Sequence, residues 1–179
     1  MLLYSHIGLY CKYKRLIANK KFLVYLSTVK YNIFQTDAEF SAYPQIRHGA
    51  CFALAIFCPL SDIFHLPIGH QEFIDFYKKE LSDNDTDIDN EMFIGNPQNY
   101  IDDLLGASGK VKYYGERPPT YSPAHGEIVW GCWHRDGTDF NHFTLTDGYG
   151  VCTYDPWILE GSASVAQGKL ISVRVALIL

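Results

Sequence analysis

Cys51 is the residue whose surroundings in the sequence best suit chemistry. It lies near the start of an apolar stretch, Ala50 to Cys58, that contains only Ala, Cys, Phe, Leu and Ile. A helix that is apolar on every side must be buried, and we expect Pro59 to end it. The free N–H groups at the start of a helix carry partial positive charge, which favours a thiolate over a thiol. We therefore predict that Cys51 is a nucleophile at the start of a buried helix.

A histidine and a carboxylate that could activate this cysteine lie far downstream. Residues 141–146 alternate in character as a strand does, residues 147–150 have the composition of a turn, and residues 151–155 resume the strand pattern. If the turn closes a four-residue hairpin, residue 146 pairs with residue 151 and His142 lies opposite Asp155. Their Cβ atoms would then be about 5 Å apart, within reach of a carboxylate–imidazole hydrogen bond. A slip of one residue would move one of them to the other face of the sheet.

A glutamine six residues before the cysteine completes a recognisable order. This order resembles that of the papain-like cysteine peptidases: Gln45, then Cys51 on a buried helix, then His142 on a strand, then Asp155 followed by Pro and Trp. The pattern is most similar to the small bacterial peptidases of the bacteriocin-leader type, and it covers residues 40–179. By this resemblance Gln45 is an oxyanion donor, Cys51 the nucleophile, His142 the base and Asp155 the residue that orients His142. Phe52 departs from the pattern, because many relatives have Gly or Trp after the cysteine.

The resemblance implies a fold and an activity. The fold is α+β and forms a single domain over residues 1–179. An N-terminal elaboration spans residues 1–40, a helical lobe with the cysteine spans residues 41–106, and an antiparallel β lobe with the histidine and aspartate spans residues 107–179. The implied activity is hydrolysis of a peptide or isopeptide bond in a peptide or protein substrate, without cofactor or metal. The alternatives are a cell-wall peptide amidase of related fold and a catalytically inactive papain-like binding module.

Local patterns predict the elements that would hold these residues. Phe73, Phe76 and Tyr77 recur at helical spacing within a helix over residues 69–81. Asn96 as cap and Pro97 as first residue open a second helix, which runs through Leu105 and ends at Gly106. Strands are predicted over residues 111–114, 127–134, 141–146, 151–154 and 170–179. A chain in which the helices precede the strands is typical of the α+β class. We expect the substrate cleft to lie between the helical half and the sheet half.

Several of these residue types also occur in proteins for purely structural reasons. Cys51 could be an inert buried thiol, as we expect for Cys58, since cysteine is among the most buried residue types. Asp147 is the alternative to Asp155 as orienting carboxylate, although its place in a turn already accounts for it. His48 is near enough in sequence to influence Cys51. A zinc site on neighbouring strands is a further alternative, with Cys132, His134, His142 and Cys152 as soft ligands. These residues lack the paired short spacings typical of structural zinc sites.

Composition bounds the partners and the compartment. The chain has 179 residues, a formal net charge of −5 and no basic stripe of the kind that binds nucleic acid, so we expect no nucleic-acid partner. Five cysteines at irregular spacing argue against a disulfide framework. We expect no integral membrane segment and no secretory signal, and hence a cytoplasmic protein. The acidic segment 83–91 lacks the Gly and Glu positions of a calcium-binding EF-hand loop.

Overall fold

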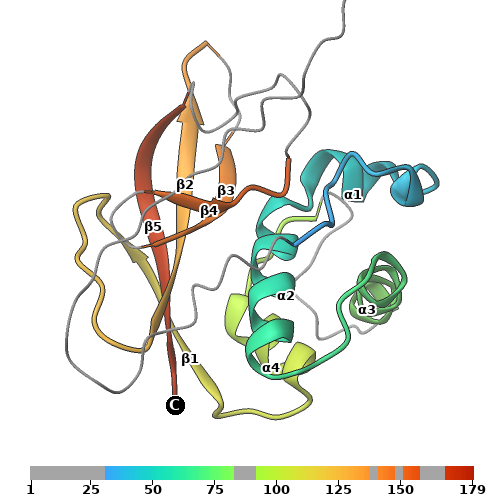
Figure 1. Ribbon diagram of the computed structural model, residues 1–179, viewed down its shortest axis with the longest axis horizontal. Helices are drawn as coiled ribbons and strands as arrows, with labels where there is room; N and C mark the ends of the chain where they lie inside the picture. The colour runs from blue at the N-terminus through green and yellow to red at the C-terminus, as the bar shows by residue number, and fades with distance from the viewer. Residues whose placement is uncertain (1–30, 83–91, 138–140, 148–150, 158–167) are drawn as a thin grey trace, which may run out of the picture.

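The computed structural model describes residues 31–82, 92–137, 141–147, 151–157 and 168–179. Most of the expected N-terminal elaboration and the acidic segment 83–91 lie outside these residues. Within them the chain is a mixed α+β structure with four α-helices and one five-stranded antiparallel sheet (Figure 1). The predicted fold class is confirmed at that level, whereas the papain-like arrangement remains a prediction.

The helices come first along the chain. A one-turn 3₁₀ helix, η1 (Ala38–Phe40), precedes α1 (Pro44–Gly49), α2 (Cys51–Ile63), α3 (His70–Ser82) and α4 (Pro97–Leu105). The helix predicted at residues 69–81 is confirmed as α3, which buries Phe73 and Tyr77 and half-buries Phe76.

Helix α4 also begins and ends where local signals place it. The Asn96 side chain accepts a hydrogen bond from the N–H of Asn99, and Pro97 is the first helical residue. Gly106 ends the helix in a left-handed conformation with a φ of 62°. Both ends are confirmed because each depends on residues adjacent in the chain.

Helix α2 does not end at Pro59, as the sequence predicted, but continues to Ile63. Proline has no N–H, so the carbonyl of Ala55, one turn earlier, loses its partner within the helix. The indole N–H of Trp130 donates a hydrogen bond to that carbonyl at 2.7 Å. The helix can therefore run through the proline because a neighbouring strand supplies the missing donor.

The sheet has the spatial order β1-β5-β2-β3-β4, and all its paired strands are antiparallel. The strands are β1 (Val111–Arg117), β2 (Glu127–Arg135), β3 (Asn141–Thr146), β4 (Cys152–Tyr154) and β5 (Gly168–Ile178). All five predicted strands are confirmed, with ends that differ by a few residues. Strand β5, the last in the chain, lies between β1 and β2.

The helices cover one face of the sheet (Figure 1). Alternate strand residues point to opposite faces, so neighbours on β2 serve different cores. Trp130 packs on the helix side, where its ring meets the ring of Phe52 edge to face with centroids 6.1 Å apart. Val129 packs on the other side in a small cluster with Val173 and Val175, and Tyr121 packs against it. The larger core therefore lies between α2 and the sheet.

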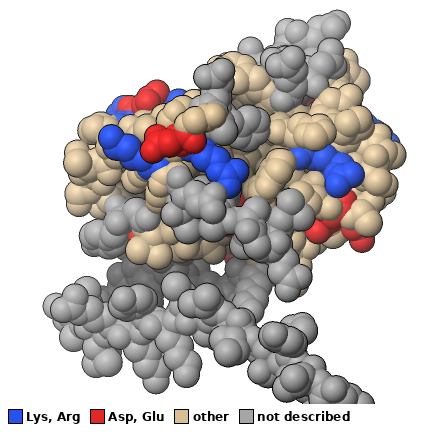
Figure 2. All heavy atoms as spheres, turned by 90° about the horizontal axis from the view of Figure 1, so that it is seen from above, with Lys and Arg blue, Asp and Glu red and all other residues tan. Residues whose placement is uncertain are grey.

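Positive and negative side chains are interspersed on the face shown in Figure 2, over a mainly uncharged surface. None of the helices in the described ranges combines the length and the apolar character needed to span a bilayer.

Candidate active site

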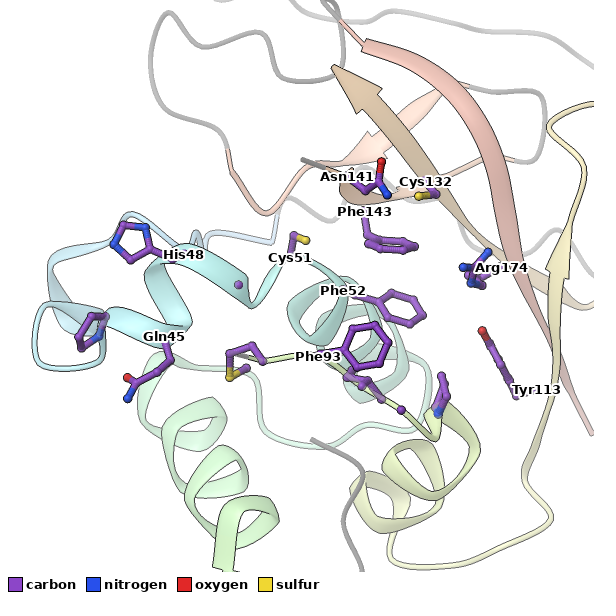
Figure 3. A pocket seen from close by; sticks show the side chains of 16 residues that line it. Gln45, His48, Cys51, Phe52, Phe93, Tyr113, Cys132, Asn141, Phe143 and Arg174 are labelled. Carbon is purple, nitrogen blue, oxygen red and sulfur yellow. The ribbon is translucent and has the colours of Figure 1, made fainter. Parts of the chain in front are cut away.

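Cys51 is the first residue of α2, as predicted, and it lines a cleft (Figure 3). Every residue from Cys51 to Ser61 is buried, so the cysteine is attached to a helix that the core holds in place. Cys51 itself is only 6% exposed. Its backbone N–H belongs to the first turn and has no partner within the helix. That N–H is therefore free to bind a substrate oxygen.

His142 and Asp155 form a buried pair. The Nε2 atom of His142 lies 2.6 Å from Oδ1 of Asp155. The same carboxylate oxygen accepts a hydrogen bond from the backbone N–H of Trp157 at 2.9 Å. The Trp157 ring stands edge-on to the imidazole, with centroids 6.5 Å apart and an interplanar angle of 80°. The predicted contact between His142 and Asp155 is therefore present, and the Trp157 ring lies beside the imidazole.

The strand pairing that the sequence predicted for this contact is wrong. Leu145 pairs with Tyr154 and Thr146 with Cys152, and the register is irregular between them. Residue 146 thus does not pair with residue 151. Asp155 follows the end of β4 and reaches His142 through its side chain, rather than from the directly opposed position.

The surroundings of His142 favour its protonated form. Burial by itself lowers the pKa of His142, because it disfavours the charged imidazolium. The hydrogen bond with Asp155, with added contributions from Cys51 and from the charge of Asp155, outweighs burial and raises the pKa to about 9. Because Asp155 occupies Nε2, Nδ1 is the nitrogen that remains for the Cys51 sulfur. The imidazole thus lies between a thiol and a carboxylate, the order in which a base activates a nucleophile.

Cys58 provides a contrast on the same helix. It is fully buried, and its S–H donates to the hydroxyl of Tyr154 at 3.6 Å. Burial raises the pKa of Cys58 to about 12, although the Tyr154 hydrogen bond acts in the opposite direction. Cys58 is therefore a core thiol, as predicted.

The structure does not bring Gln45 to Cys51. The buried residue of α1 is Ile46, and its neighbour Gln45 is therefore turned outward and exposed. In Figure 3 the Gln45 amide points away from the Cys51 sulfur, as does the His48 ring. Gln45 is the second residue of the short helix α1, and the helix sets the direction of its side chain.

Asp147 and His134, the alternative carboxylate and one of the candidate zinc ligands, each have a partner close by in the sequence. Asp147 accepts a hydrogen bond from the N–H of Val151 at 3.1 Å, which fits its predicted place in the turn. His134 bonds through Nδ1 to Oδ1 of Asn141 at 3.1 Å. Within the described ranges, no three His, Cys, Asp or Glu residues gather into a group that could hold a metal ion.

The cleft beside Cys51 has a volume of about 1060 Å³ and is lined from both halves of the chain. Cys51, Phe52 and Ile94 come from the helical half, whereas Phe143 and Arg174 come from the sheet. In Figure 3, Phe52 and Phe143 lie between Cys51 at one end and Arg174 at the other. The expected cleft between the halves is therefore present, and its volume is sufficient for several substrate residues.

Sequence reasoning missed the residues at the far end of the cleft. The Phe143 ring stacks on Phe52 with centroids 4.5 Å apart, and the Arg174 guanidinium lies 5.7 Å from the Phe143 ring centroid. The signal was an arginine two residues before a core alanine, Ala176, on a strand whose side chains alternate. An arginine on the core-facing side of a strand needs a partner or a ligand.

Comparison with protein-family models, with curated proteins and with solved structures found no match for this chain.

Proposed function

We propose that the chain is a papain-like thiol hydrolase that cleaves a peptide or isopeptide bond with Cys51, His142 and Asp155. The observation that carries the proposal is the position of His142, whose Nε2 atom lies 2.6 Å from Oδ1 of Asp155 and whose pKa is raised in part by Cys51. These residues come from α2, β3 and the segment after β4, and they meet beside a cleft that can hold a peptide. The raised pKa of His142 supports a protonated imidazole beside the sulfur.

The reaction has two steps in this proposal. The Cys51 thiolate attacks the substrate carbonyl to form a C–S bond, and the oxyanion accepts a hydrogen bond from the Cys51 N–H. His142 gives its proton to the leaving amine as the C–N bond breaks, which leaves a thioester. His142 then takes a proton from water, and the resulting hydroxide adds to the thioester and expels the thiolate. Asp155 keeps the imidazole oriented throughout, and the products are an amine and a carboxylic acid.

The second oxyanion donor in this proposal is Gln45, which must first rotate toward Cys51. Loss of one oxyanion donor lowers turnover on the order of 10²-fold. If Gln45 adopts this role when substrate binds, Gln45→Ala lowers kcat to that extent. Arg47→Ala, an exposed neighbour on α1, is the matched control and should leave kcat unchanged. Equal rates for both variants would remove Gln45 from the mechanism.

The test of the proposed activity is incubation of the full chain with a peptide library that includes isopeptide-linked members. Mass spectrometry then reports newly formed termini. Wild type should generate new termini, whereas Cys51→Ala and His142→Gln should generate none. Cleavage that persists in Cys51→Ala would contradict the proposal.

A binding module of the same fold is the second candidate, and the outward direction of Gln45 favours it. Such a module would hold peptide in the cleft without turning it over. Wild type would then bind members of the library and release them intact, and Cys51→Ala would bind them equally well. Any product that depends on Cys51 excludes this candidate.

A further inference from the structure

Arg174 lies on the cleft-facing side of β5 among apolar neighbours. Of the described residues that line the cleft, Arg174 alone carries a permanent charge. Its side chain is 22% exposed, and its guanidinium lies over the Phe143 ring. Burying a charge among apolar side chains costs free energy unless the charge gains polar partners. The position of Arg174 therefore calls for polar partners in the protein or in a ligand.

Two contacts on one nitrogen fix the direction of this guanidinium. Nη1 of Arg174 bonds to Oε2 of Glu116 at 2.8 Å and to the hydroxyl of Ser172 at 3.2 Å. Glu116 is 59% exposed, so solvent screens its attraction. No residue within the described ranges accepts a hydrogen bond from Nη2 or Nε of Arg174. These donors remain for a ligand in the cleft.

A bulge in β1 places a second donor beside Arg174. Tyr113 pairs with Ala176 and Glu116 with Arg174, with a register shift between Tyr113 and Gly115. Gly115 has a φ of +81°, a conformation that glycine adopts readily at such a bulge. The extra residue brings both Tyr113 and Glu116 to the face of the sheet that carries Arg174.

The Tyr113 hydroxyl is suited to donate a hydrogen bond. In Figure 3 it points toward Arg174 at the end of the cleft away from Cys51. Within the described part of the chain it bonds to no other side chain. Burial raises the pKa of Tyr113, while the charge of Arg174 partly opposes this, so the phenol keeps its proton at neutral pH.

We propose that Arg174 and Tyr113 form a subsite for a carboxylate of the substrate, with Phe52 and Phe143 as the apolar wall between it and Cys51. Guanidinium and phenol donors suit a carboxylate, and charge-assisted hydrogen bonds to it are stronger than neutral ones. The substrate class is then an acidic peptide, whose carboxylate belongs to an Asp or Glu side chain or to a free C-terminus. That the ligand is a peptide rests on the proposed function.

The test compares matched chloroacetyl-tripeptides that alkylate Cys51 and that end in an amide except where a free carboxylate is stated. One group carries Glu at a single position, the reference carries Gln throughout, and a third probe carries Gln with a free C-terminal carboxylate. The half-saturating concentration for Cys51 alkylation is read by mass spectrometry. Wild type should favour a carboxylate probe over the reference on the order of 10-fold. Preference for a Glu probe identifies a side-chain carboxylate, and preference for the third probe identifies a C-terminus.

Variants assign the preference to the subsite. Arg174→Gln should abolish it, Arg174→Lys should reduce it, and Tyr113→Phe should weaken it severalfold. Arg117→Gln, on the same strand as Tyr113 but away from the cleft lining, should keep it. Equal values for all probes in wild type, or a preference that survives Arg174→Gln, would overturn the subsite.

The same comparison separates this inference from the proposed function. The acetyl forms of the probes, which cannot react, are titrated into Cys51→Ala by calorimetry, so the preference is measured without chemistry. A carboxylate preference there, with no peptide cleavage by wild type, supports the subsite and contradicts the hydrolase. Cleavage without carboxylate preference supports the hydrolase and contradicts the subsite.

Discussion

The carboxylate of Asp155 acts on His142 through both geometry and charge. Its Oδ1 atom bonds to Nε2, and the N–H of Trp157 holds that oxygen in place. Its negative charge also favours the imidazolium in a site where burial opposes it. Asp155 thus orients His142 and contributes, together with Cys51, to its state of protonation.

Replacement of Asp155 by Asn should therefore lower the pKa of His142. Asparagine keeps the size of the side chain but removes the charge. The measurement is an NMR titration of the His142 ring, followed between pH 5 and pH 10. Asp147→Asn, at the turn, is the control and should leave the titration unchanged. Identical curves for wild type and Asp155→Asn would show that Asp155 does not control the base.

Element boundaries depend on either local or distant partners. The ends of α4 were predictable, since Asn96, Pro97 and Gly106 act on neighbours in the chain. The end of α2 was not predictable, because the donor that replaces the missing N–H of Pro59 is Trp130 on β2. Local propensity therefore fails where a long-range hydrogen bond compensates for a helix breaker.

This compensation predicts a coupling between Trp130 and Pro59. Trp130→Phe should lower the free energy of unfolding by about 2–4 kcal/mol, because it leaves the Ala55 carbonyl unsatisfied and a small cavity. In a Pro59→Ala background the alanine N–H restores a helical donor. The cost of Trp130→Phe should then be smaller by about 1 kcal/mol or more. Urea denaturation of all four proteins measures this cycle, and strictly additive effects would contradict the compensation.

At the scale of the molecule, the sequence was a better guide to which residues lie together than to the strand pairing that brings them together. Cys51, His142 and Asp155 were identified from residue types and order, and the cleft follows from packing α2 on the sheet. The predicted pairing of β3 with β4 was wrong because the register shift between Leu145 and Thr146 leaves no local signal in the sequence. Arg174 and Tyr113 were missed because their shared face depends on the bulge at Gly115.

The buried His142 should make the stability of the whole domain depend on pH. Its pKa is raised from 6.5 to about 9, so its contribution is fully present below pH 6.5 and is lost as pH rises through about 9. The contribution is at most about 3 kcal/mol. The difference in unfolding free energy between wild type and His142→Gln should therefore shrink between pH 6 and pH 9.5. A difference that stays constant over this range would contradict the raised pKa.

The most direct test of the account is the rate at which iodoacetamide modifies each cysteine of the native chain at pH 7. Cys51 is almost fully buried, whereas Cys152 is partly exposed, so access alone would favour Cys152. If His142 activates the sulfur, Cys51 reacts first, and His142→Gln slows it at least 10-fold without changing Cys152. A Cys51 that reacts more slowly than Cys152, at a rate unaffected by His142→Gln, would contradict the account.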